Sequence, residues 1–164
     1  GTLDPDVLTR RIRAVRSADS ARSVWVAPSV SVRATKDEVR DDLGAMIVAM
    51  ANRAFRGDLS DRNLPPAIER DVHEMWRRYD YAFHADNSRP ANVEVVTPAL
   101  SDYLIDHTCV WGDEDRWRAR LDLLESQGCD GVMFIMGQAD QAAALREIAQ
   151  RLVALGRLPA SVTG

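Results

Sequence analysis

Residues 108–137 have the sequence TCVWGDEDRWRARLDLLESQGCDGVMFIMG, and this stretch decides the fold class. A short apolar run is followed by a glycine–acidic turn, an amphipathic run, a second glycine and another apolar run. This order predicts strand, helix, strand, and two strands joined by one helix pair in parallel in compact domains. The stretch therefore predicts a parallel sheet, which binds ligands at the carboxyl ends of its strands.

The rest of the chain alternates in the same way. Residues 24–32 (VWVAPSVSV) place a valine at every second position on one side, which predicts a strand in spite of Pro28. We expect the three strands to be neighbours in the order 24–32, 108–111, 130–136. Helices are predicted from N-capping residues followed by apolar residues at helical spacing, over about 5–16, 36–50, 66–83, 98–105 and 141–155. The pattern is that of an α/β protein.

Composition restricts the class of protein. The length of 164 residues fits one domain, and the net charge of −4 argues against a nucleic-acid partner, which would require a basic stripe. Cys109 and Cys129 lie in apolar runs, where free cysteine behaves as a small buried hydrophobe, so we expect no disulfide and a reducing cytoplasm. The sequence has neither a charged-then-apolar leader nor an apolar run of ~18 residues, so we expect neither secretion nor a membrane span.

The segments HTCVWGDEDRWRARLDLLESQGCDGVMFIM and AALREIAQRLVAL resemble the C-terminal end of the luciferase-like flavin or deazaflavin oxidoreductases. A glycine–acidic turn, one helix face and the start of a strand carry the resemblance: Gly112, Asp113, Arg120, Leu121, Leu124, Gly128, Asp130, Gly131 and Val132. RATKDEVRDDL is similar to the helix start after the family's sixth strand, and GTLDPDVL to the segment after the fifth. The resemblance covers nearly the whole chain but only about the last half of a family member.

This resemblance implies the C-terminal part of a (β/α)8 TIM barrel, a fold of typically ~250 residues. Residues 1–164 would form a single partial domain that supplies strands six to eight with their helices, and 56–100 would be a helical or irregular insertion. A complementary N-terminal barrel half and a homodimer are the implied partners. The family's flavin-phosphate loop would precede Gly1, so we expect the isolated chain to be inactive and free of cofactor.

The implied activity is that of an oxidoreductase acting on a small-molecule substrate. It would be a luciferase-like monooxygenase or an F420-dependent reductase or dehydrogenase, using a flavin or deazaflavin for hydride transfer or oxygen activation. YDYAFH and FIMG resemble the methylene-tetrahydromethanopterin reductase branch, which favours coenzyme F420 over FMN. The alternative from another class is a non-catalytic α/β interaction module that binds a partner chain.

Three residues are candidates for cofactor binding because they follow predicted strands. Gly112 permits close backbone approach, and the helix start after Asp113 offers free N–H groups to a phosphate; Gly137 follows the last strand. The alternative interpretation makes Gly112 and Asp113 a tight turn and an N-cap.

Three other residues are candidates for the substrate pocket. Ser31 faces away from the valines, Trp111 lies at the carboxyl end of its strand, and His84 lies in the insertion. In the alternative interpretation, Ser31 is a small residue that fills the interior, Trp111 packs in the core, and His84 is a surface histidine. The three histidines show no metal-ligand spacing, no metal is expected, and no catalytic residue is identified. Hydrolase, P-loop and dinucleotide motifs do not occur.

Overall fold

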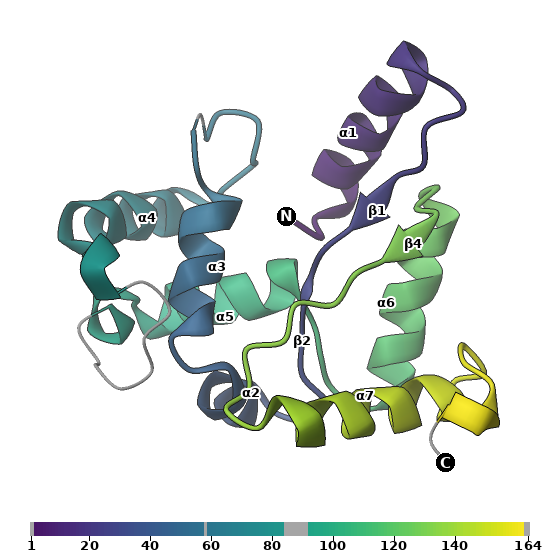
Figure 1. Cartoon of the computed structure of the whole chain (residues 1–164). Helices are drawn as coiled ribbons and strands as arrows, with labels where there is room; N and C mark the ends of the chain where they lie inside the picture. The colour runs from purple at the N-terminus through teal and green to yellow at the C-terminus, as the bar shows by residue number, and fades with distance from the viewer. Residues whose placement is uncertain (1, 58, 84–91, 163–164) are drawn as a thin grey trace.

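The structure is a computed structural model, which describes residues 2–57, 59–83 and 92–162 (Figure 1). Its helices are α1 (Pro5–Ala18), α2 (Lys36–Leu43), α3 (Met46–Ala54), α4 (Pro66–Arg78), α5 (Pro98–Thr108), α6 (Glu114–Ser126) and α7 (Gln141–Ala154), with short 3-10 turns η1 (Tyr81–Phe83), η2 (Val93–Val95) and η3 (Ala160–Val162). Its strands are β1 (Trp25–Val26), β2 (Ser29–Val30), β3 (Cys109–Val110) and β4 (Gly131–Val132). In the described part of the chain, no helix has both the length and the apolar character needed to cross a membrane.

All strand pairs are parallel, which confirms the predicted α/β class with a parallel sheet. β1 and β2 are the two parts of one extended segment that Pro28 interrupts. β2 pairs with β3, whereas β1 pairs with β4, and an isolated bridge joins Ser29 to Ile135. The segment 24–31 therefore lies between the other two.

The predicted neighbour order was wrong, because residues 108–111 do not lie between the other two strands. α6 has 13 residues and is about 20 Å long. A helix of this length can connect strands that lie either one or two strand spacings of ~4.8 Å apart. The Asp130 carboxylate then fixes the choice: it accepts hydrogen bonds from the Val24 N–H and from Arg16, each at 2.6 Å. The start of the third predicted strand, residues 130–136, is thereby attached to β1. This segment contains β4, and we call it the third strand.

Alternate residues of the sheet belong to two different hydrophobic cores. Val26, Val30 and Val110 pack in the core covered by α1, α6 and α7, while Cys109 and Trp111 belong to the core formed by α2 to α5. Figure 1 shows α3 and α6 on opposite sides of the strands. We call the side covered by α1, α6 and α7 the valine face. The opposite side is the serine face, whose residues follow from the pairing and the period of two: Trp25, Ala27, Ser29, Ser31, Cys109, Trp111, Gly131, Met133 and Ile135.

The predicted helix starts are confirmed by side-chain caps. Thr35 and Glu38 form the predicted capping box, and Asp4, Thr97 and Asp140 cap their helices as expected. Three boundaries differ. The helix predicted over about 66–83 ends at Arg78, and Tyr81–Phe83 form the short turn η1. The helix predicted over 36–50 breaks between α2 and α3, because Gly44 adopts a φ of +49° that ends α2. α5 extends to Thr108, where a strand was predicted to begin, and the Thr108 hydroxyl donates to Leu104 O within the last turn.

Candidate functional site

A buried polar network joins the carboxyl ends of two strands. The Ser31 hydroxyl donates to Asp42 Oδ2 at 2.7 Å, and Gln138 Nε2 donates to the same oxygen at 3.0 Å and to Val30 O at 2.7 Å. Ser31 is fully buried, and the Asp42 side chain is 12% exposed. The carboxylate, which comes from α2, therefore holds the end of the central strand against the end of the third.

Gly112 and Asp113 form a tight turn and the N-cap of α6. The φ of Gly112 is +103°, a conformation that favours glycine. Its N–H donates to Arg33 O and its carbonyl accepts from Arg151, both at 3.0 Å, while Asp113 accepts from the Arg116 N–H at 2.9 Å. Cofactor binding by Gly112 and Asp113 stays a prediction, and the Gly112 N–H is already engaged.

Three arginines surround this turn. Arg33 follows the central strand and pairs with Glu147 at 3.0 Å, while Arg151 reaches the Gly112 carbonyl from α7. The Arg116 guanidinium lies 3.7 Å from the centroid of the Trp111 ring. Arg33 is also paired with Asp42 and Arg116 with Asp106, so an anion at this turn would have to replace those carboxylates. Sequence reasoning missed the three arginines because they lie far apart in the chain.

Two buried polar atoms on the serine face have no hydrogen-bond partner among the described residues. They are Ser29 Oγ and Trp111 Nε1, in residues that are 2% and 6% exposed. An unpartnered buried donor costs free energy, so each one calls for an explanation, and a bound ligand is one. Trp111 otherwise packs in the core of α2 to α5, as its alternative interpretation proposed.

Gly137 lies against α3. A Cβ at this position would be 2.6 Å from Met46 Cβ, so the absence of a side chain lets the strand end approach the helix. Its N–H donates to the Gln138 side chain at 3.0 Å. This packing accounts for a glycine here without a cofactor, and a cofactor role for Gly137 stays a prediction.

The structure thus gathers Ser31, Trp111, Gly112 and Asp113 at the carboxyl ends of the strands. His84 lies outside the described residues. The network and the turn add residues that the sequence did not reveal: Arg33, Asp42, Arg116, Gln138 and Arg151. Asp42 could not be identified from sequence, because nothing local distinguishes it from a surface residue of a helix. Gln138 lies at the predicted end of the last strand, but its sequence position does not indicate its partners.

Other titratable groups lie elsewhere. His107 stacks on Tyr103 with ring centroids 3.9 Å apart, and its Nδ1 is 2.8 Å from Tyr103 O. Within the described ranges, no three His, Cys, Asp or Glu side chains gather in a group that could hold a metal ion. Burial raises the pKa of the Cys109 thiol, and burial together with the Asp130 charge raises the pKa of Cys129. Neither thiol has the lowered pKa of an activated nucleophile.

Comparison of the chain with protein-family models, with curated proteins and with solved structures gives no match.

Proposed function

We propose that this chain is the C-terminal part of a luciferase-like oxidoreductase that binds coenzyme F420, or FMN in its place, at the carboxyl ends of its strands. The observation that carries the proposal is the difference between the two faces of the sheet. Helices pack against both faces, but the valine face is apolar, whereas the serine face also bears serines and two buried donors that have no partner among the described residues. In a (β/α)8 barrel, helices cover the outside and the site lies at the carboxyl ends of the strands.

The residues at this end fit an anionic ring cofactor. Ser29 Oγ and Trp111 Nε1 have no partner among the described residues and suit carbonyl oxygens of the ring. Arg33, Arg116 and Arg151 could supplement the phosphate loop that the resemblance implies before Gly1, if the phosphate replaces their present carboxylate and carbonyl partners. The bound cofactor would supply hydride transfer or oxygen activation. The chain would orient it, keep water from its ring through the core of α2 to α5, and hold its charge.

In a barrel, the strand segment 130–136, which contains β4, would have a different neighbour. Consecutive strands are adjacent in a barrel, whereas residues 131–135 pair here with the central segment. The contacts to be exchanged include the bonds that the N–H groups of Asp130, Met133 and Ile135 donate to the central segment, and the bond from the Val24 N–H to the Asp130 carboxylate. We propose that a complementary N-terminal barrel half supplies the missing strands, that β3 then separates the other two, and that the complete enzyme forms a homodimer.

A fluorescence titration of coenzyme F420 and of FMN tests the proposal. It compares the 164-residue chain with the polypeptide as its gene encodes it. We expect one equivalent of cofactor to bind the gene product and none to bind the chain, because the phosphate loop implied by the resemblance precedes Gly1. Absence of binding by the gene product would exclude the oxidoreductase.

The second candidate function is a non-catalytic α/β interaction module, and the strand order favours it. The central segment is already flanked at both edges, so the described chain completes its own middle strand. Sedimentation and thermal melting distinguish the two functions. A monodisperse, cofactor-free monomer with a sharp transition would support the module, whereas association and a broad transition would support a partial barrel.

A further inference from the structure

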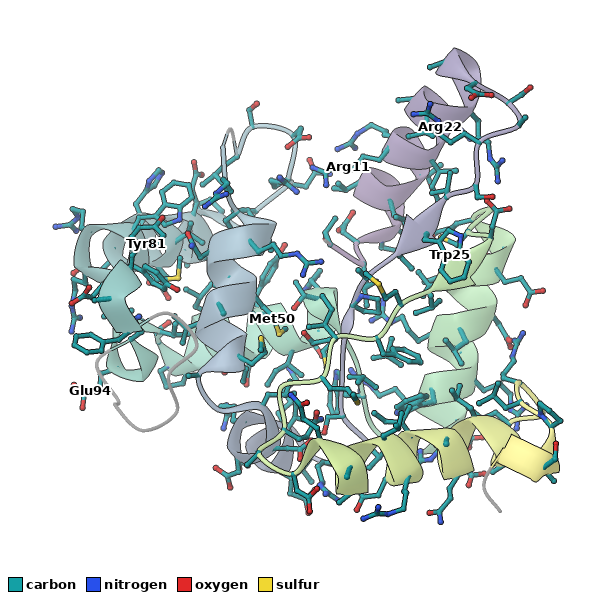
Figure 2. The ribbon with its side chains drawn as sticks, in the orientation of Figure 1. Arg11, Arg22, Trp25, Met50, Tyr81 and Glu94 are labelled. Atoms are coloured by element: carbon teal, nitrogen blue, oxygen red, sulfur yellow. The ribbon has the colours of Figure 1, made fainter. Side chains whose placement is uncertain are left out.

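A cavity of about 310 Å³ lies between α3 and the strand segment 130–136 that contains β4. Its apolar lining comes from Met46, Ala49 and Met50 on α3 and from Ile135 on the serine face. The α3 residues share one side of the helix, since their spacing is three and four. In Figure 2, Met50 projects from α3 toward the strands. The volume falls at the lower end of the roughly 300–1,000 Å³ usual for small-molecule pockets.

Two arginines give this cavity its charge. Arg53 and Arg56 line it together with the buried Asn52 amide. Among the described residues neither arginine forms an ion pair with a carboxylate, and Arg53 makes one long bond, 3.4 Å, to Ala27 O. Arg33, Arg40 and Arg116, by contrast, are each paired with aspartate. As far as the described residues go, the guanidinium groups beside the cavity are available to a ligand.

A second cavity, of about 290 Å³, has Arg53 in common with the first and is otherwise lined by α1, the residues before it and the central segment. Its lining includes Trp25, which is 64% exposed, and Ala27 on the serine face. An apolar tail longer than the first cavity could extend here. Methionine side chains adapt to the shape of an apolar ligand, while a guanidinium binds a carboxylate through two parallel hydrogen bonds.

We infer that the cavity beside α3 binds a small carboxylate with an apolar tail, held by Arg53 and Arg56 and packed against Met46, Met50 and Ile135. The assignment rests on the proposed function, because Ile135 places the cavity beside the serine face and the ligand would be the substrate of that site. The two positive charges exclude an organic cation, and the apolar lining disfavours a sugar or a free phosphate.

Isothermal titration calorimetry of the chain with three eight-carbon probes tests this inference. The probes are octanoate, octanol and octyltrimethylammonium, which share a tail and differ in the charge of the head group. We expect octanoate to bind with one-to-one stoichiometry, octanol to bind about tenfold more weakly, and the cation not to bind. Equal affinities for octanoate and octanol, or no octanoate binding, would overturn the assignment.

Variants locate the site. Arg53→Gln combined with Arg56→Gln should lower octanoate affinity by about tenfold or more, while octanol affinity stays unchanged. Arg146→Gln removes an exposed arginine of α7 and should leave both affinities unchanged. All the exchanged arginines are exposed, and thermal melts check that the variants fold. Unaltered octanoate binding by the double variant would place the carboxylate elsewhere and refute the inference.

The outcome is separable from that of the cofactor titration, which uses no carboxylate ligand. Cofactor binding without octanoate binding would reject the substrate class and keep the oxidoreductase. Octanoate binding by a gene product that binds no cofactor would leave a carboxylate site but overturn its assignment as a substrate site.

Discussion

Trp117 connects α6 to the sheet. It is fully buried, it packs against Phe134 of the third strand, and its Nε1 donates to Ser31 O at 3.3 Å. Trp117→Ala should therefore lower the free energy of unfolding by about 3–5 kcal/mol, through lost burial and a cavity. Trp25→Ala removes a tryptophan that is 64% exposed and should change it by less than about 1 kcal/mol. Urea unfolding measures both, and equal losses would contradict the packing described for α6.

The two thiols should differ in reactivity although the pKa of each is raised. Cys109 is fully buried and Cys129 half-buried, and burial is the main cause of the raised pKa in both. A raised pKa keeps a thiol protonated below that pKa, so at pH 8 alkylation by iodoacetamide should be slow at Cys129 and should require unfolding at Cys109. Mass spectrometry of the alkylated native chain gives the order, and faster labelling of Cys109 would refute it.

Residue patterns in the sequence predicted the local part of the site but not its assembly. The turn at Gly112 and the cap at Asp113 depend on neighbours within four residues, so they could be read from the sequence. The meeting of Asp42 with Gln138, or of Arg151 with Gly112, depends on how helices cross the sheet. Those contacts join positions about 40 to 100 residues apart, and no sequence periodicity records them.

Among the elements, helices were predicted better than the strand arrangement. Capping residues and apolar spacing specify where a helix starts, as at Thr35 and Asp140. The alternation in 24–32 likewise specified the two faces of the central strand, because a period of two fixes which residues share a face. The order of strands follows instead from side-chain contacts such as that of Asp130 with Val24, which the predicted order did not include.

The packing of the third strand against α3 is tested at Gly137. Gly137→Ala would bring a Cβ within 2.6 Å of Met46 Cβ, and this part of Met46 cannot move without its helix. We expect the free energy of unfolding to fall by about 1–3 kcal/mol. The sign is informative, because a glycine replaced by alanine in open space without backbone strain stabilises a protein by roughly 0.4–1 kcal/mol. An increase in stability would contradict the close approach.

Across the whole molecule, the chain has three layers, with one side of the sheet only partly covered. α1, α6 and α7 close the valine face, whereas on the serine face Trp25 and Met133 remain 64% and 58% exposed. The third strand is paired along one edge in the described residues, so its other edge offers backbone groups to a further strand. The incompletely covered side is the one on which we place the cofactor and the substrate.

The most direct test of this account is the cofactor affinity of the gene product and its stability, compared with Ser29→Ala and Trp111→Phe. Each change removes a buried polar atom that has no partner in the described part of the chain. If these atoms serve a cofactor, each variant should bind coenzyme F420 or FMN about 2- to 10-fold more weakly, the worth of one hydrogen bond. Without cofactor, Ser29→Ala should unfold at the same or a higher denaturant concentration. Unchanged cofactor affinity in both variants would contradict the claim that the serine face binds it.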